Sequence, residues 1–131
     1  GEPVSMGSYD VLVNRALNVS FVNCSQTNDI NDRTYWGVMA SNYSKNLLYD
    51  NCRWSRFDAH MGVANATIRN STLGHMGINA IGTGVFTVEN STVYGNNLIN
   101  LRSDYGSTWQ GEIVIRNSTF VPAGGRPVSA S

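Results

Sequence analysis

The phrase Asn-Val-Ser-Phe-Val-Asn-Cys at residues 18–24 recurs in related form along the chain. Four further copies follow it: Asn-Leu-Leu-Tyr-Asp-Asn-Cys at 46–52, Asn-Ala-Thr-Ile-Arg-Asn-Ser at 65–71, Val-Phe-Thr-Val-Glu-Asn-Ser at 85–91 and Glu-Ile-Val-Ile-Arg-Asn-Ser at 112–118. The late asparagine of each copy, here called the anchor, is Asn23, Asn51, Asn70, Asn90 or Asn117, so the copies are 28, 19, 20 and 27 residues apart. Repeats of about 20–50 residues indicate a solenoid, in which each repeat buries its apolar face against its neighbours.

Within each phrase, apolar residues alternate with polar or charged ones. Two positions before the anchor stand Phe21, Tyr49, Ile68, Val88 and Ile115, and four positions before it stand Val19, Leu47, Ala66, Phe86 and Ile113. A period of two with many β-branched residues predicts a half-buried strand, because a helix would place its apolar residues three and four positions apart. We therefore expect Ile68 and Ile115 to be buried and Thr67 to face outward.

The anchor stands where the inward-facing series changes phase. Asparagine tolerates a left-handed backbone and bonds to its own neighbouring backbone, so we expect each anchor at a bend between two short strands. Stacked amide side chains can also bond to one another, as they do in cross-β assemblies. The repeat therefore predicts an asparagine ladder along the anchors.

The residue after the anchor is Cys24 or Cys52 in the first two copies and serine in the others. Parallel strands in register point their Cβ atoms the same way, which suits the dihedral angle of a disulfide poorly. We expect two free thiols stacked in the interior.

A second strand is expected between successive phrases. Its members are residues 11–13, 38–40, 57–59, 78–80, 99–101 and 128–130. Strand–bend–strand passages with no helical segment predict an all-β parallel β-helix of about five to six coils, spaced about 4.8 Å apart. We expect this domain to occupy residues 9–131 and to be a fragment of a longer helix, incomplete at its C-terminus, with residues 1–8 as a linker or irregular edge.

Composition excludes several partners. The 131 residues are 41% hydrophobic with zero formal net charge and no basic run, so nucleic acid and anionic membrane surfaces are not expected to bind. No apolar stretch approaches the roughly 20 residues that span a bilayer. No phosphate-binding loop or nucleophile elbow is present, and two histidines alone make a zinc site improbable, so we expect no cofactor and no metal.

The repeated Asn-Ser-Thr, together with Ile-Asn-Ala-Ile-Gly-Thr-Gly at 78–84 and Asn-Leu-Arg-Ser-Asp-Tyr-Gly at 100–106, resembles right-handed parallel β-helix proteins of the pectate-lyase-like superfamily. Within that group the chain is most similar to phage tailspikes and secreted bacterial β-helix proteins. The resemblance implies a right-handed coil, a polysaccharide partner and an extracellular or virion location such as a phage tail. A homotrimer or end-to-end association is left open.

The motifs of the enzymatic members are absent. The chain has no Asn-Thr-Asp, Asp-Asp, Gly-His-Gly or Arg-Ile-Lys motif, and Gly74-His75-Met76 is a partial match to one of them. It also lacks the aspartate cluster with which pectate lyases hold calcium. No catalytic residue follows from the resemblance, and we expect His75 to bond to backbone in its turn.

Candidate site residues come instead from the strands between phrases. Their outward column reads Leu12, Met39, Asp58, Asn79, Asn100, and a second column two residues on reads Ser41, His60, Ile81, Arg102. Carbohydrate sites combine planar hydrogen-bonding groups, a carboxylate and an aromatic platform. We therefore expect Asp58, His60 and Arg102 as the catalytic set if the chain is a lyase or hydrolase, and Asn79, Asn100, Asp104, Tyr105 and Trp109 as substrate-binding residues. Asp58 and Asp104 should lie about 10 Å apart, near the upper limit for an inverting glycosidase.

Two classes of function remain open on the sequence. One is a carbohydrate-facing module of a secreted or virion-associated protein that binds or cleaves a polysaccharide. The other is a structural shaft or adhesin segment without chemistry. Solvent-facing strand positions are usually polar in any protein, so the polar columns alone do not separate the two.

Overall fold

The computed structural model describes residues 11–27, 29–32, 38–95, 97–104, 107–122 and 128–130. All regular elements in these ranges are strands. They are β1 (Val11–Asn14), β2 (Leu17–Val22), β3 (Val38–Asp50), β4 (Arg53–Arg69), β5 (Thr72–Ala80), β6 (Gly82–Glu89), β7 (Thr92–Gly95), β8 (Ile99–Leu101), β9 (Ser103–Asp104), β10 (Ser107–Thr108), β11 (Glu112–Arg116), β12 (Thr119–Pro122) and β13 (Val128–Ala130). The all-β prediction is confirmed for the part of the chain that the structure describes.

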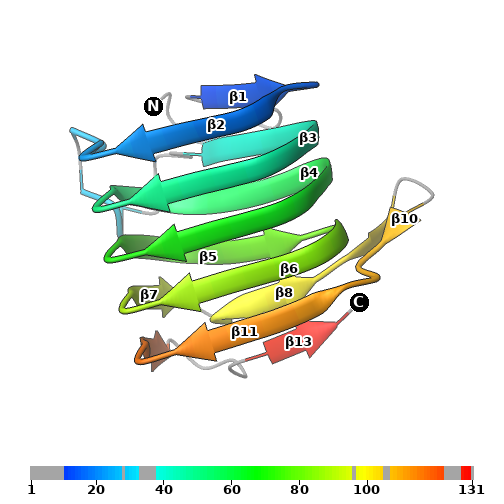
Figure 1. Cartoon of the computed structure of the whole chain (residues 1–131). Coiled ribbons are helices and arrows are strands. Elements are labelled where there is room, and N and C mark those ends of the chain that lie inside the picture. Colours follow the sequence, from blue (N-terminus) through cyan, green and yellow to red (C-terminus); the bar gives the residue numbers. More distant parts are fainter. Residues whose placement is uncertain are drawn as a thin grey trace.

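Eleven of these strands form one parallel, strongly curled sheet, and β9 and β10 form a separate antiparallel pair. The phrase strands β2, β6 and β11 lie in one layer, and the strands between phrases, such as β1, β8 and β13, lie in a second layer behind it (Figure 1). The long strands β3 and β4 pass from the second layer into the first. This arrangement is compatible with a parallel β-helix.

The pairing registers place equivalent residues of successive repeats side by side. In the phrase strands, Ile68 pairs with Tyr49 and with Val88. After the anchor, Leu73 pairs with Trp54 and Val93, and between the phrases Phe57, Ile78 and Ile99 pair in turn. Each repeat therefore contributes three strand positions, two in the layers of Figure 1 and a short one directly after the bend.

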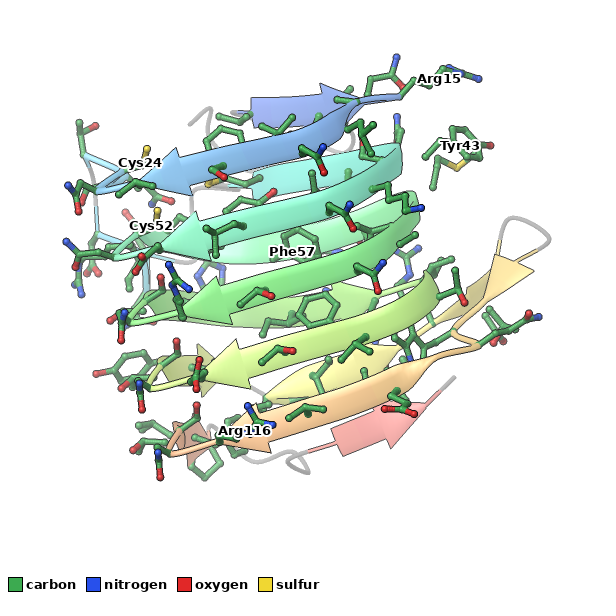
Figure 2. The ribbon with its side chains drawn as sticks, in the orientation of Figure 1. Arg15, Cys24, Tyr43, Cys52, Phe57 and Arg116 are labelled. Atoms are coloured by element: carbon green, nitrogen blue, oxygen red, sulfur yellow. The ribbon has the colours of Figure 1, made fainter. Side chains whose placement is uncertain are left out.

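The core fills the space inside the curled sheet. Ile68 and Phe57 have no exposed surface, and Figure 2 shows Phe57 between the two layers. Aromatic contacts run through this interior from Phe21 to Tyr49, Phe57, Phe86 and Trp109, with ring centroids 5.1, 5.4, 5.4 and 6.2 Å apart. These contacts join aromatic residues of the phrase strands to Phe57 of the strand between phrases and to Trp109, so the core is continuous across the two layers.

The expected burial of Ile115 is wrong, because 40% of this residue is exposed. Its strand β11 pairs with β6 on one edge, and no described strand pairs with its other edge. The inward pattern of a solenoid repeat buries a side chain only where neighbouring repeats lie on both sides.

The anchors do lie at bends, as predicted. All five have left-handed backbone, with φ of 59° at Asn23, 55° at Asn51, 51° at Asn70, 49° at Asn90 and 46° at Asn117. Each lies between a phrase strand and the short segment that follows it. Asparagine is here because this conformation is costly for most other side chains.

The predicted ladder of anchor side chains is largely wrong. The Asn51 amide donates to Asn23 at 2.7 Å, but the Asn70 amide donates to the Asp50 carboxylate at 3.0 Å instead of to its neighbouring anchor. All five anchors are exposed, so their side chains meet water as readily as each other. A different asparagine ladder forms at the start of the phrase, where Asn46 donates to Asn18 and Asn65 donates to Asn46.

The ladder at the bend is made by the residue after the anchor. The hydroxyls of Ser71, Ser91 and Ser118 donate to the backbone carbonyl two residues earlier, at 2.7–2.9 Å. Each also accepts the backbone N–H of the equivalent residue in the preceding repeat, which is Cys52, Ser71 or Ser91. Because the bend interrupts regular pairing, these hydroxyls supply the missing hydrogen-bond partners.

Both cysteines are free thiols, but only one of them is interior. Cys52 is buried and its thiol lies 3.3 Å from the Phe21 carbonyl oxygen. Burial raises the pKa of the Cys52 thiol. Cys24 is exposed, contrary to expectation, and Figure 2 shows both cysteines at the bend beside the first two anchors.

Candidate functional site

The strands between phrases bring three of the predicted site residues into one row. Asp58 of β4 pairs with Asn79 of β5, which pairs with Asn100 of β8. Ala40 of β3 continues this row, so Met39 does not belong to it. Met39 pairs with Phe57 and is buried in the core. In β3 the residue of the outward column is therefore Ala40, one position after the predicted Met39.

Asp58 is the centre of a buried ion-pair cluster. Its two carboxylate oxygens accept hydrogen bonds from Arg56 Nη2 at 2.9 Å and from Arg102 Nη1 at 3.0 Å. The Asp58 side chain is 4% exposed, and those of Arg56 and Arg102 are 12% and 15% exposed. The expectation of a solvent-facing carboxylate is therefore wrong, and Asp58 instead holds Arg56 of its own strand and Arg102, which follows β8 two repeats later.

The two asparagines of the row bond to each other. The Asn100 amide nitrogen donates to the Asn79 carbonyl oxygen at 2.9 Å. Asn79 is buried at 9% exposure, whereas Asn100 is half-buried. This short amide stack continues the row from the arginine cluster toward β13, whose Ser129 pairs with Asn100.

Three of the predicted residues are not described at the level of the side chain. His60 lies in β4 and Asp104 in β9, but their side chains, and the whole of Tyr105, lie outside the described part of the structure. The expected separation between Asp58 and Asp104 stays a prediction.

Trp109 does not stand apart as an open aromatic platform. It is half-buried, packs against the core cluster, and meets the Phe86 ring nearly edge-on at 74°. Its backbone forms a bridge with Gly82. Trp109 is therefore part of the core packing at the point where the chain after β10 pairs with the sheet.

Outside this row, His75 bonds to backbone as predicted, with Nδ1 3.0 Å from the Ile30 carbonyl oxygen, but it lies within β5 and not in a turn. At the anchor bend, Asn70 and Arg69 hydrogen-bond to Asp50 and hold the pKa of that carboxyl below its ordinary value. The described residues contain no group of three or more histidine, cysteine or acidic side chains that could hold a metal ion. Nor do they form a helix long and apolar enough to cross a membrane.

Sequence reasoning missed Tyr43 of β3. This tyrosine is 56% exposed and has left-handed backbone with φ of 52°. Arg15 stacks on its ring, with Cζ 5.0 Å from the centroid. The available signal was an aromatic residue directly after Asn42 at the corner between the two strand positions of one repeat.

Comparison with known proteins gives one informative relative. A protein named "Depolymerase, capsule KL64-specific" from a Klebsiella phage is 30% identical in an alignment 135 residues long, and the aligned part is 86% of this chain and 13% of the relative. The chain thus spans a small part of the length of the protein it matches. No family model matches the chain, and no solved structure matches it.

Proposed function

We propose that this chain is a polysaccharide-facing module of a virion-associated, extracellular protein, and that it binds its polysaccharide rather than cleaving it. The observation that carries the proposal is the similarity to a phage capsule depolymerase over 86% of the chain. The curled parallel sheet supports it, because a solenoid presents long, regular faces along which a polymer can lie. We also propose that the sheet is a section of a right-handed parallel β-helix of the pectate-lyase-like kind.

The geometry at Asp58 favours binding over cleavage. A general acid or base must come within hydrogen-bond reach of the proton that it transfers. Both oxygens of Asp58 are bonded to arginines, and the carboxylate is buried. Asp58 is equipped to orient Arg56 and Arg102, and guanidinium groups held in this way suit the recognition of hydroxyls and carboxylates on a sugar.

The proposed contact region on this face is Asn79 and Asn100 of the row, together with Arg102, which lies two residues after Asn100. All three side chains are planar hydrogen-bonding groups, and Asn79 and Asn100 lie at the spacing of successive strands, about 4.8 Å. A repeating arrangement of this kind matches a ligand that itself repeats. His60, Asp104 and Tyr105 remain proposed neighbours of this region.

The test uses the intact protein and purified KL64-type capsular polysaccharide. Biolayer interferometry measures binding, while reducing ends and the ultraviolet absorbance of unsaturated products measure hydrolase and lyase activity. Binding without either product supports the proposal, and product formation would replace it with an enzymatic function. Absence of binding to this and to a panel of other capsules would leave the structural shaft as the better account.

A further inference from the structure

A groove crosses several repeats at the corner where the strand between phrases turns into the phrase strand. Its volume is about 290 Å³, and its lining includes Tyr43, Gly62, Gly82, Thr83, Thr108 and Gln110. These residues come from β3, β4, β6, β10 and the segment after β10. We call it the Tyr43 groove. Figure 2 shows Tyr43 at the right-hand edge of the sheet, outside the ribbon and close to Arg15.

The backbone of Tyr43 is held in an unusual conformation. A left-handed φ is uncommon for a bulky residue, and such strain persists only where the surroundings impose it, often at ligand sites. Arg15 has the same conformation, with φ of 50°, and pairs in register with the Tyr43 position because Asn14 pairs with Asn42. The guanidinium over the ring fixes its orientation through a cation–π contact.

In the next repeat a glycine lies beside Tyr43. The register runs from Asn42 opposite Met61 to Ser44 opposite Val63, which places Gly62 beside Tyr43. A Cβ atom added to Gly62 would meet no atom within 4 Å. The row therefore reads Arg15, Tyr43, Gly62: a cation lies over the ring in one repeat, and the next repeat has no side chain at the matching position, although Met61 beside it also lines the groove.

Polar groups form the opposite wall. Thr83 donates its hydroxyl to the Gln110 carbonyl at 3.5 Å, and Thr83, Thr108 and Gln110 are all exposed. The residues that line the groove are uncharged. The volume is near the lower end of the roughly 300–1,000 Å³ that is usual for small-molecule sites, which suits one ring of a longer chain.

We propose that the Tyr43 groove binds one neutral pyranose ring of the polysaccharide. The apolar face of the sugar stacks on the side of Tyr43 that faces Gly62, and its hydroxyls bond to Thr83, Thr108 and Gln110. This inference rests on the proposed polysaccharide function and names a contact point for it away from the arginine cluster. Aromatic stacking with hydroxyl and amide groups opposite is the chemistry that a neutral sugar requires.

The test measures the affinity of the intact protein for KL64-type capsular polysaccharide in three variants. Tyr43→Gly removes the ring and suits the left-handed backbone, so a folded protein with affinity lower by about tenfold or more is expected. Tyr43→Phe keeps the stacking surface and should bind within about twofold of the parent. Tyr94→Ala, which removes a half-buried tyrosine of β7 outside the groove, is the matched control and should leave the affinity unchanged.

The outcomes separate the two proposals. If the parent binds and Tyr43→Gly binds equally well, the groove is not the sugar site, while the polysaccharide function stands. If Tyr94→Ala lost as much affinity as Tyr43→Gly, the assignment of the Tyr43 groove as the sugar site would also be overturned. If the parent binds none of a panel of capsular polysaccharides, the proposed function fails, and the groove proposal fails with it.

Discussion

The hydroxyl oxygen of Ser91 lies 3.1 Å from the backbone nitrogen of Ser71 and accepts its N–H, although the two residues are 20 positions apart. The same hydroxyl donates to the Glu89 carbonyl at 2.8 Å. Both serines are buried, so water is a poor substitute for either bond. A side chain one position after the bend therefore joins two repeats at the point where the regular strand pairing is interrupted.

Replacing Ser91 with alanine should lower the free energy of unfolding by about 1–3 kcal/mol, because the buried Ser71 N–H loses its partner, whereas the Glu89 carbonyl still accepts the Asn70 N–H. Ser91→Cys should lie between the parent and alanine, since a thiol is a weaker donor and acceptor. Ser20→Ala, at an exposed position of β2, is the control and should stay within about 0.5 kcal/mol. Urea unfolding followed by circular dichroism measures all three, and equal stability of Ser91→Ala and the parent would contradict this role for the ladder.

The anchors act through their backbone conformation, and Asn90 tests this most directly. It has φ of 49°, and none of the hydrogen bonds resolved for the described residues involves its side chain. Asn90→Ala should cost about 1–2 kcal/mol, the price of a left-handed alanine, while Asn90→Gly should be nearly neutral because glycine adopts this conformation freely. If glycine proved as destabilising as alanine, the amide itself would have to be the stabilising group.

The period-two alternation predicts the interior well wherever repeats lie on both sides. Ile68→Asp should prevent folding, since a lone charge in an apolar core costs several kcal/mol. Thr67→Lys, one position earlier and half-buried on the other face, should be tolerated. Expression and circular dichroism of the two variants provide the comparison. Similar behaviour would show that the assignment of inside and outside is wrong.

The repeat predicts strand positions and bends because those features are local. Alternating apolar residues define the inward face of a strand, and asparagine at each bend reports a left-handed backbone, as Asn70 and its equivalents confirm. The pairing register between strands depends on contacts between residues that are distant in the sequence. Val38 and Met39 are both apolar, so the sequence alone does not decide which of them pairs with Phe57. In the structure, Met39 pairs with Phe57.

The candidate site was harder to predict because its character depends on contacts between distant residues. The sequence places Asp58 and Arg102 on neighbouring columns, but only the fold shows that they form an ion pair and that the carboxylate is buried. Trp109 likewise lies in a polar insertion, yet it packs on Phe86. An outward strand position predicts exposure only if no other segment covers it.

Acid should weaken the interaction of Asp50 with Arg69 and Asn70. Because the pKa of Asp50 is lowered in the folded state, its contribution to stability is fully present above the pKa of the unfolded chain and is lost as the pH falls through the folded value. The difference in unfolding free energy between the parent and Asp50→Asn should thus be constant above about pH 5 and shrink below about pH 4. Salt should reduce this difference as well, since the ion pair is partly exposed. A difference that grew on acidification would contradict the lowered pKa.

Asp58→Asn separates a positioning carboxylate from a catalytic one. If Asp58 holds Arg56 and Arg102, the neutral amide removes a carboxylate charge that two largely buried guanidinium groups share. The loss of stability should then approach the roughly 3–5 kcal/mol that follows when one partner of a buried pair is removed. Asp58→Asn should weaken binding to capsular polysaccharide by about as much as Arg102→Gln, because Arg102→Gln removes one of the positioned guanidinium groups directly.

A catalytic Asp58 predicts the opposite pattern for Asp58→Asn. The variant is then stable and still binds the polymer but forms no product, because only the carboxylate can exchange a proton. Unfolding curves, binding and product assays on the same preparations of both variants decide between these patterns, with Ser20→Ala as the control for handling.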